Sequence, residues 1–522
     1  MSTRDEADEA VDQAVYGLMA VHGRAAGRPT RIGVDFVSAA TGVAAASGRL
    51  AATISKLRGR AVSRVHTARP SVALLTVSQY LAAGSAGDPD HVERYDRPGT
   101  PPPFTTRDGH RVELETLDPE PWRRFWTGLG LAPAVVDRGW RAFVPRYATA
   151  SAPLPDELHI AIAALSLLEL FTAATKTGVA VQPVRSHADR LGDGLDGPPW
   201  TVTATGGPAT RRPAAHPGGL PLAGLTVLEA GRRIQGPLAA HLLGLLGASV
   251  TRIEPAGGDP LRGMPPMVGD CSARFLALNR GKQVVQANLR SASGRESVRE
   301  LAAGADVFLH NWAPGKASEL GLDSDDLIKI NPGLVYAYAS GWGARRGPDA
   351  PPGTDFTVQA YAGLGEHLRP AGHPAAGSLM TLLDVLGGLV CAQGVLAALV
   401  GRLRDGRGRR VDSSLLSSAS LLQALQRSGH RPAQPVWGPL DVPVPTADGH
   451  LVVPSGTPPG LVDPTALRRL PTAQAVAGLR SDGISAVRVC PDPGELVRDP
   501  QVRPLLDIDG CAFVRSPWRF DP

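Results

Sequence analysis

The spacing of apolar and polar residues between positions 224 and 255 predicts a strand, a helix and a second strand. Thr226 to Leu228 is a short apolar run typical of a buried strand, and residues 238–246 repeat apolar side chains at helical spacing. Gly247 ends the helix, and Val250 to Ile253 forms the second strand. This βαβ unit requires a parallel sheet and offers a helix N-terminus to an anionic ligand.

Similar patterns predict further elements along the chain. Helices are expected at 5–24, 119–130, 154–176 and 384–402. A further, alanine-rich helix is expected to follow residues 32–42 and to end at about Lys56. Asp-Gly pairs at 108–109 and 448–449 predict two β-hairpins. Residues 85–102 and 190–219 are rich in glycine and proline and are interpreted as connections.

The apolar stretch Leu382 to Gly401 has two interpretations. It is long enough to cross a membrane, and five arginines follow it closely. However, Asp384, Gln393 and three glycines lie within it. A buried core helix of a large α/β protein is therefore the better interpretation, and we expect no membrane association.

Two parts of the chain repeat the same pattern. Gly42, Gly48 and residues 50–52 correspond to Gly388, Gly394 and residues 396–398. Residues 106–110 resemble 446–450, and 177–184 resemble 482–489, in the same order. The first copy has no counterpart of the βαβ region, and the second copy is shortened after its hairpin. The sequence thus predicts a partial tandem duplication.

Composition limits the classes of function. The chain has 522 residues, 43% hydrophobic residues and a formal net charge of +5, which is too modest over this length to indicate nucleic-acid binding. The four cysteines are scattered and form no C-x-x-C pair, which predicts a reducing, cytoplasmic location and no metal site. The polar, acidic first ten residues do not resemble a signal peptide. The turn of the βαβ unit has no G-x-G-x-x-G, so a nicotinamide-dependent oxidoreductase is disfavoured.

An ordered series of motifs between about residues 221 and 416 resembles the family III CoA-transferases, the CaiB/BaiF type. This family includes formyl-CoA and carnitine CoA-transferases and α-methylacyl-CoA racemase. The motifs are 221–230, Gly236-Pro237, Ile253-Glu-Pro255, Gly257-Gly-Asp-Pro-Leu-Arg262, Phe275-Leu-Ala-Leu-Asn-Arg-Gly-Lys282, 305–315, Asn331-Pro-Gly333, Ser340-Gly-Trp-Gly343, Gly353-Thr-Asp355, Asp384 and Gly406-Arg-Gly408. No single motif is specific, but their order is.

The resemblance implies an α/β fold: a Rossmann-like large domain with an open parallel sheet and a small α+β domain, here partially duplicated in tandem. We therefore divide the chain into a partial large-domain segment (1–84), a small domain (85–190), a linker (191–220), a large domain (221–435), and a shortened small domain with a returning C-terminal segment (436–522). Protomers of this family interlock, so the chain is expected to form a homodimer or a single-chain pseudo-dimer.

Asp384 aligns with the catalytic aspartate of the family. By resemblance, its carboxylate attacks an acyl-CoA thioester, releases CoA thiolate and holds the acyl group as a mixed anhydride. On its position alone, Asp384 could instead cap the helix. Ser38 takes its place in the first copy, with Asp35 one turn earlier, so a second active site is not expected there.

The resemblance also suggests residues that contact CoA. They are Gln235, Arg262, Leu278, Asn279, Arg280, Lys282, Asn311, Trp312, Ser340 and Gly341. Basic side chains suit the CoA phosphates, and Trp312 could stack on the adenine. Glu319 departs from the arginine usual in relatives, and Gln235 is one place later than the glutamine of formyl-CoA transferase, where Ile234 stands here.

Three functions remain open at this point. The first is a CoA-transferase that moves CoA from an acyl-CoA to a carboxylic acid, with both as substrates and no tightly bound cofactor. The second is an acyl-CoA racemase, which is disfavoured because Thr354 stands where that branch has a histidine acid/base. The third is a CoA-binding protein without catalytic activity.

Overall fold

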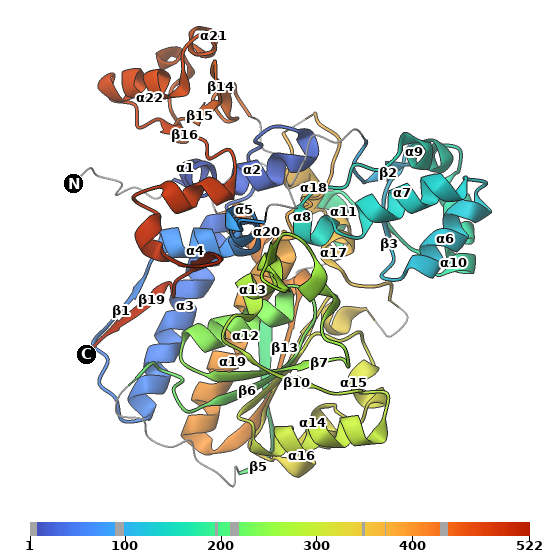
Figure 1. Ribbon diagram of the computed structural model, residues 1–522, viewed down its shortest axis with the longest axis vertical. Helices are drawn as coiled ribbons and strands as arrows, with labels where there is room; N and C mark the ends of the chain where they lie inside the picture. The colour runs from blue at the N-terminus through green and yellow to red at the C-terminus, as the bar shows by residue number, and fades with distance from the viewer. Residues whose placement is uncertain are drawn as a thin grey trace.

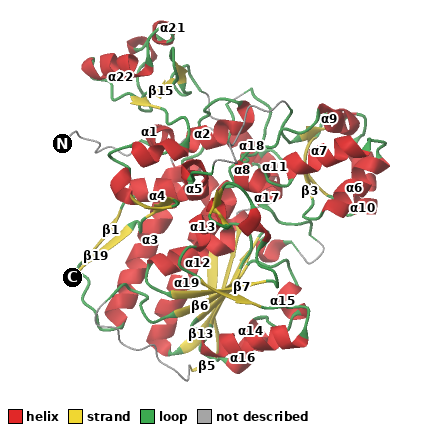
Figure 2. Cartoon of the chain, in the orientation of Figure 1, coloured by secondary structure: helices red, strands yellow, loops and turns green. Residues whose placement is uncertain are grey.

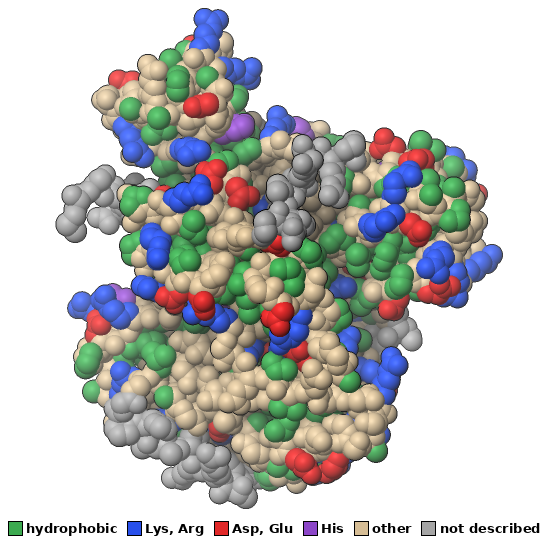
Figure 3. Space-filling view, in the orientation of Figure 1, with side chains coloured by type: hydrophobic (Ala, Val, Ile, Leu, Met, Phe, Trp, Pro, Cys, Tyr) green, Lys and Arg blue, Asp and Glu red, His purple; other side chains and the backbone are tan. Residues whose placement is uncertain are grey.

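A seven-stranded sheet with helices on both faces forms the body of the protein, and two smaller lobes project from it (Figures 1, 2 and 3). The computed structural model describes residues 8–88, 99–193, 197–208, 219–346, 350–370, 372–428 and 437–522.

The large sheet has the strand order β10-β7-β6-β11-β12-β13-β5, and all neighbouring pairs are parallel except β13 with β5. From β6 the chain adds β7 and β10 on one side and then β11, β12 and β13 on the other, so the strand order reverses between the parallel strands β6 and β11. The carboxyl ends of these two strands form the crevice where such sheets bind ligands. The strands are β5 (Trp200–Pro208), β6 (Thr226–Ala230), β7 (Ser249–Glu254), β10 (Gln283–Gln286), β11 (Val307–His310), β12 (Val335–Ser340) and β13 (Arg407–Ser414). With α12 (Gln235–Leu245) between β6 and β7, the predicted βαβ unit is confirmed.

Neighbouring residues of the strands pack on opposite faces of this sheet. Leu228, Phe308 and Tyr336 pack with α14 (Ala292–Gly304) and α16 (Ser324–Ile330). Val227 and Val307 belong instead to the main core, which also contains α12, α3 and α19. This alternation is what a sheet covered on both faces requires.

The helix α19 (Leu382–Asp405) crosses the main core. Within the described parts of the chain it is the one unbroken helix long and apolar enough to span a membrane, but most of its apolar stretch is buried inside the protein. The prediction of a core helix is confirmed.

The first copy places α3 (Phe36–Leu57) directly against α19 (Figure 1). The difference in residue number between Gly48 and Gly394 (394 − 48 = 346) also relates β1 (Arg64–Thr67) to residues 410–413 within β13. Each copy is followed by a strand that pairs with the other copy: β5 pairs antiparallel with β13, and β19 (Trp518–Asp521) pairs antiparallel with β1. The first residue of each returning strand, Trp200 or Trp518, packs on the equivalent glycine of the opposite copy, Gly394 or Gly48.

The two small domains are exchanged in the same way. The first contains β2 (Phe104–Thr105), β3 (Arg111–Glu115) and β4 (Ala180–Pro183), and docks on α17 (Asp355–Tyr361) of the second copy. The second contains β14 (Val444–Pro445), β15 (His450–Val452) and β16 (Val487–Arg488), and docks on α1 (Glu9–Val15). The helices of the first are α6 (Pro119–Gly128), α7 (Pro133–Phe143), α9 (Asp156–Ala163) and α10 (Leu167–Thr177); the second has α22 (Thr472–Ser481). Both predicted hairpins are present.

Two sequence expectations need correction. The segment 191–220 was predicted to be a linker, but it contains β5, whose backbone pairs with β13. The single helix expected over 154–176 is two helices, α9 and α10, which meet at 116°. Ser166 and Glu169 form a capping box that starts α10 afresh.

Candidate functional site

Asp384 lies in the first turn of α19, at the end of the helix that faces the first small domain. The residue before the helix, Thr381, has a left-handed backbone (φ 55°) and is the N-cap, so Asp384 itself does not cap the helix. Its side chain is half-buried. A carboxylate at a helix N-terminus is favoured by the helix dipole, while its burial raises the pKa of Asp384 well above the usual range.

A second carboxylate holds this turn in place. The Oδ2 atom of Asp355 accepts the backbone N–H of Asp384 at 2.6 Å, and its Oδ1 atom accepts a hydrogen bond from Gln359 Nε2. Gln359 in turn binds the backbone N–H and C=O of Ser378, so α17 is joined to the segment before α19. Asp355 is buried, and this burial raises its pKa. The negative charge of Asp355 raises the pKa of Asp384 further.

The first copy contributes residues to the same site. The Thr354 hydroxyl donates to Glu115 Oε2 at 2.5 Å, and Arg146 Nη2 binds that oxygen at 3.0 Å. Glu115 is on β3 and Arg146 on α8 (Arg146–Thr149), both far from α17 along the chain. Arg146 also lies over the ring of Phe356, 4.5 Å from its centroid. The small domain of one copy therefore closes the site of the other.

The same framework occurs in the first copy, with a serine in place of Asp384. Glu9 accepts the backbone N–H groups of Val37 and Ser38 at 2.8 and 2.9 Å, and Gln13 donates to it at 3.0 Å. These residues are related to Asp355, Gln359 and Asp384 by the offset that relates the two copies. Ser38 replaces Asp384, and Arg69 binds the Ser38 hydroxyl at 3.0 Å.

Four of the predicted CoA contacts surround the crevice at the end of β6. Gln235 is buried, and its Nε2 atom lies 3.5 Å from the backbone oxygen of Ser340, next to Gly341. Asn311 joins the two sides of the crevice, because its amide accepts from the N–H of Arg232 at 2.8 Å and donates to the Arg232 oxygen at 2.9 Å. The structure thus brings together Gln235, Ser340, Gly341 and Asn311.

The half-buried ring of Trp312 stands beside this group. It packs against His310 at 4.8 Å and Phe308 at 6.0 Å between ring centroids. It extends an aromatic cluster on the face of the sheet that carries α14 and α16.

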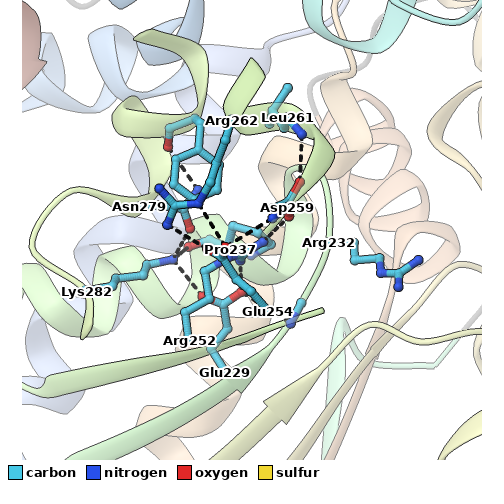
Figure 4. Close-up of polar contacts among 12 residues, drawn as sticks. Glu229, Arg232, Pro237, Arg252, Glu254, Asp259, Leu261, Arg262, Asn279 and Lys282 are labelled. Atoms are coloured by element: carbon cyan, nitrogen blue, oxygen red, sulfur yellow. Dashed lines mark hydrogen bonds and ion pairs between the residues drawn. The ribbon is translucent and has the colours of Figure 1, made fainter. Parts of the chain in front are cut away.

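Three other predicted CoA residues belong to a buried ionic network (Figure 4). Lys282 Nζ binds Glu229 Oε2, the Pro237 oxygen and Asn279 Oδ1, at 2.8, 2.8 and 2.9 Å. An ammonium group has three N–H donors, so all three are used inside the protein. Arg262 forms a bidentate pair with Glu254, with both contacts at 2.8 Å.

This network corrects the role expected for Lys282. Its side chain is only 2% exposed, and its partner Glu229 is completely buried. Burial lowers the pKa of Lys282 to about 8. Lys282 and Asn279 therefore support the βαβ unit rather than reaching outward to a phosphate.

The remaining predicted residues lie outside the crevice. Leu278 is buried in the core, whereas Arg280 is partly exposed and lies over the ring of Phe513, 4.4 Å from its centroid. Glu319, the departure noted in the sequence, forms an exposed pair with Lys316 at 2.6 Å.

Sequence reasoning assigned no role to Asp355, Glu115 or Arg146. Asp355 could have been found, because it belongs to the recognised Gly353-Thr-Asp motif and its spacing to Gln359 repeats that of Glu9 to Gln13. Glu115 and Thr354 are 239 residues apart, and no local pattern connects them.

Comparisons with known proteins agree with this architecture. The family model described as CoA-transferase family III matches the chain twice, at residues 2–195 and 222–459. Over 248 residues the chain is 36% identical to succinyl-CoA:glutarate CoA-transferase of Mus musculus, covering 45% of this chain and 57% of that protein. Over 246 residues it is 37% identical to acetyl-CoA:oxalate CoA-transferase of Acetobacter aceti, covering 45% of this chain and 63% of that protein. The matches thus span less than two thirds of these relatives.

A solved structure shows the same fold. The CAIB/BAIF family protein from Brucella suis superposes with a TM-score of 0.52 at 26% sequence identity, over 58% of this chain and 93% of that one. The repeated match to the family model covers most of the chain and agrees with the partial duplication seen in the fold. The chain belongs to CoA-transferase family III.

Proposed function

We propose that this protein transfers CoA from an acyl-CoA donor to a carboxylic acid through an acyl anhydride on Asp384. The observation that carries the proposal is the half-buried carboxylate of Asp384 at the start of a core helix, held by Asp355 and closed over by the first small domain. A nucleophile in such a position is shielded from bulk water, which would otherwise hydrolyse the anhydride.

The proposed reaction has four steps. An oxygen of Asp384 attacks the thioester carbonyl, the C–S bond breaks, and CoA leaves as a thiolate. The thiolate then attacks the aspartyl carbonyl, which forms an aspartyl-CoA thioester and releases the donor acid as a carboxylate. The acceptor carboxylate attacks this thioester and regenerates an anhydride and CoA thiolate. Attack of the thiolate on the acceptor's carbonyl gives the new acyl-CoA and free Asp384.

The residues around the crevice are suited to CoA itself. We assign the pantetheine arm to the space beside Gln235, Ser340 and Gly341, and the adenine to the aromatic surface of Trp312. The crevice between the ends of β6 and β11 is where open α/β sheets bind their ligands, which supports this assignment. Arg280 and Arg262 lie outside this group, and the proposed placement of CoA does not depend on them.

Racemisation is the weaker candidate. It needs a second acid/base opposite Asp384, and Thr354 occupies the position where the racemase branch has a histidine. A threonine hydroxyl does not exchange a proton with carbon at neutral pH, and here it donates to Glu115.

We further propose that each chain has one active site and works as a single-chain pseudo-dimer. The exchange of small domains and returning strands within one chain supports this arrangement. Ser38 leaves the second half-site without a carboxylate nucleophile. Four buried free cysteines are consistent with the cytoplasmic location expected from the sequence.

The test is CoA exchange between a panel of acyl-CoA donors and carboxylic acids, followed by chromatography. Asp384→Asn should lower the exchange rate by at least ~10³-fold, because the nucleophile is removed without a change of shape. Ser38→Ala, the equivalent position of the first copy, is the matched control and should retain exchange. Equal rates in the wild type and Asp384→Asn would refute the proposed mechanism, and CoA binding without exchange by any donor would favour a binding protein.

A further inference from the structure

Arg233 adopts an unusual backbone conformation in the turn between β6 and α12. Its φ is 62°, and only two other non-glycine residues in the described part of the chain, Ala150 and Thr381, have a positive φ. This left-handed conformation is strained for a residue with a Cβ atom, and such strain is commonly retained at functional sites. Thr381 directly precedes the helix that bears Asp384, so two of the three lie next to the candidate site.

The guanidinium of Arg233 is unusual in its lack of polar partners. It lies over the ring of Tyr147, 4.9 Å from the centroid, and Tyr147 belongs to the first copy. Among the described residues, no carboxylate forms an ion pair with Arg233, and no side-chain or backbone oxygen accepts its N–H groups. By contrast, Arg146 and Arg252 are both paired with carboxylates. The half-buried Arg233 therefore keeps its five N–H donors available.

Packing brings the turn that carries Arg233 close to the start of α19. Gln235, two residues after Arg233, contacts α19 so closely that a Cβ at Gly387 would meet its Nε2 atom at 2.9 Å, and one at Gly388 would meet its oxygen at 3.0 Å. These glycines are one turn beyond Asp384. The positive charge of Arg233 accordingly lowers the pKa of Asp384, in opposition to burial and Asp355.

We propose that Arg233 binds a second carboxylate group of the substrate, so that the site prefers dicarboxylic acyl groups and acceptors. This inference rests on the proposed function, because one carboxyl end must react at Asp384 while the other is held. A planar guanidinium pairs with a carboxylate through two parallel hydrogen bonds. Tyr147 holds the guanidinium from the opposite copy, so the preference depends on both halves of the chain.

The experiment compares four-carbon ligands that carry a second carboxylate at the far end with four-carbon ligands that end in a methyl group. Succinyl-CoA and butyryl-CoA are offered to the wild type, Arg233→Leu and Arg233→Lys, with hydroxylamine trapping of the acyl group. Binding of free succinate and butyrate is measured separately by calorimetry. Arg232→Leu is the control, because this neighbouring arginine side chain is exposed.

We expect Arg233→Leu to lower kcat/KM for succinyl-CoA by about 100-fold relative to butyryl-CoA, since the distal carboxylate would lose its charged hydrogen-bond partner. Arg233→Lys should recover part of the preference, and Arg232→Leu should keep it. Equal losses with both donors, or an unchanged ratio, would overturn the inference. If no donor acylates the wild type, the proposed function fails. Succinate binding that depends on Arg233 would still support the anion site, and its absence would overturn that site as well.

Discussion

Ser38 and Asp384 are equivalent residues in two copies of one framework, and only Asp384 carries a carboxylate. Each has its backbone N–H bound by a buried carboxylate, Glu9 or Asp355, four residues before a glutamine. Burial raises the pKa of both Glu9 and Asp355. The first copy therefore keeps the support of the site and lacks only the group that would react.

The pH dependence of acylation should reveal the coupling between Asp384 and Asp355. In the proposed mechanism Asp384 attacks as a carboxylate, so the rate should rise with pH as its raised pKa is passed. Asp355→Asn removes a neighbouring negative charge, which lowers the pKa of Asp384 and should move the rate profile to lower pH. Single-turnover acylation at a series of pH values measures this.

Glu9→Gln makes the equivalent change in the first copy and serves as the control. It should leave the profile where it is in the wild type. A profile that does not move in Asp355→Asn, or that moves to higher pH, would contradict the assigned coupling.

Only part of this residue-scale picture could be predicted from the sequence. The order of the motifs located Asp384 and the crevice residues. The contacts of Glu115 and Arg146 depend on how one copy docks on the other, which no local pattern shows. The motif that contains Lys282 suggested a side chain that contacts CoA. The side chain instead turns inward, because it pairs with Glu229, which lies 53 residues earlier in the chain.

At the scale of elements, the ionic network of Figure 4 joins β6, β7 and Lys282, the residue before β10, to the last residue of α13 (Ala273–Asn279). Arg252 bonds to Glu229 and Asp259 in the same cluster. Most of these charges are buried and each is paired with an opposite charge, so removing one leaves a buried partner less well compensated.

Lys282→Met should therefore lower the free energy of unfolding by about 3 kcal/mol, because Glu229 would be left buried and partly unpaired. Chemical denaturation measures the change. Arg280→Met, two residues earlier and partly exposed, is the control and should change stability by less than about 0.5 kcal/mol. If Lys282→Met keeps its stability but loses CoA affinity, then Lys282 contacts CoA, as the sequence first suggested.

The elements that could be predicted are those with local signals. Apolar periodicity and Asp-Gly turns gave the βαβ unit, α19 and both hairpins. The edge strand β5 is rich in threonine and glycine, and it is a strand because β13 offers its backbone for pairing. Its location therefore depends on a partner about two hundred residues away, and the sequence around it looks like a connection.

For the whole molecule, the exchange of strands and small domains makes each half depend on the other. The first copy contributes α3, β5 and a small domain to the second, and receives β19 and a small domain in return. Trp518 and Trp200 anchor the two returning strands at equivalent glycines. The repeat predicted two copies, but the exchange between them is a property of the fold.

This mutual dependence can be tested by expressing residues 1–208 and 219–522 as two chains. Produced together, they should elute as one complex on gel filtration, because the α3–α19 contact and both strand pairs join them. Produced alone, residues 219–522 should aggregate, since the apolar face of α19 would be exposed. A well-folded, monomeric second chain would contradict the single-chain pseudo-dimer.

The most direct test of a single active site at Asp384 is the number and position of acyl groups on the intact chain. Purified protein is incubated with an acyl-CoA and hydroxylamine, and hydroxamate is quantified by intact-mass and peptide mass spectrometry. We predict one hydroxamate per chain, located on Asp384 and absent from Asp384→Asn. Modification of any other residue, or two modifications per chain, would contradict the assignment of a single active site built from both copies.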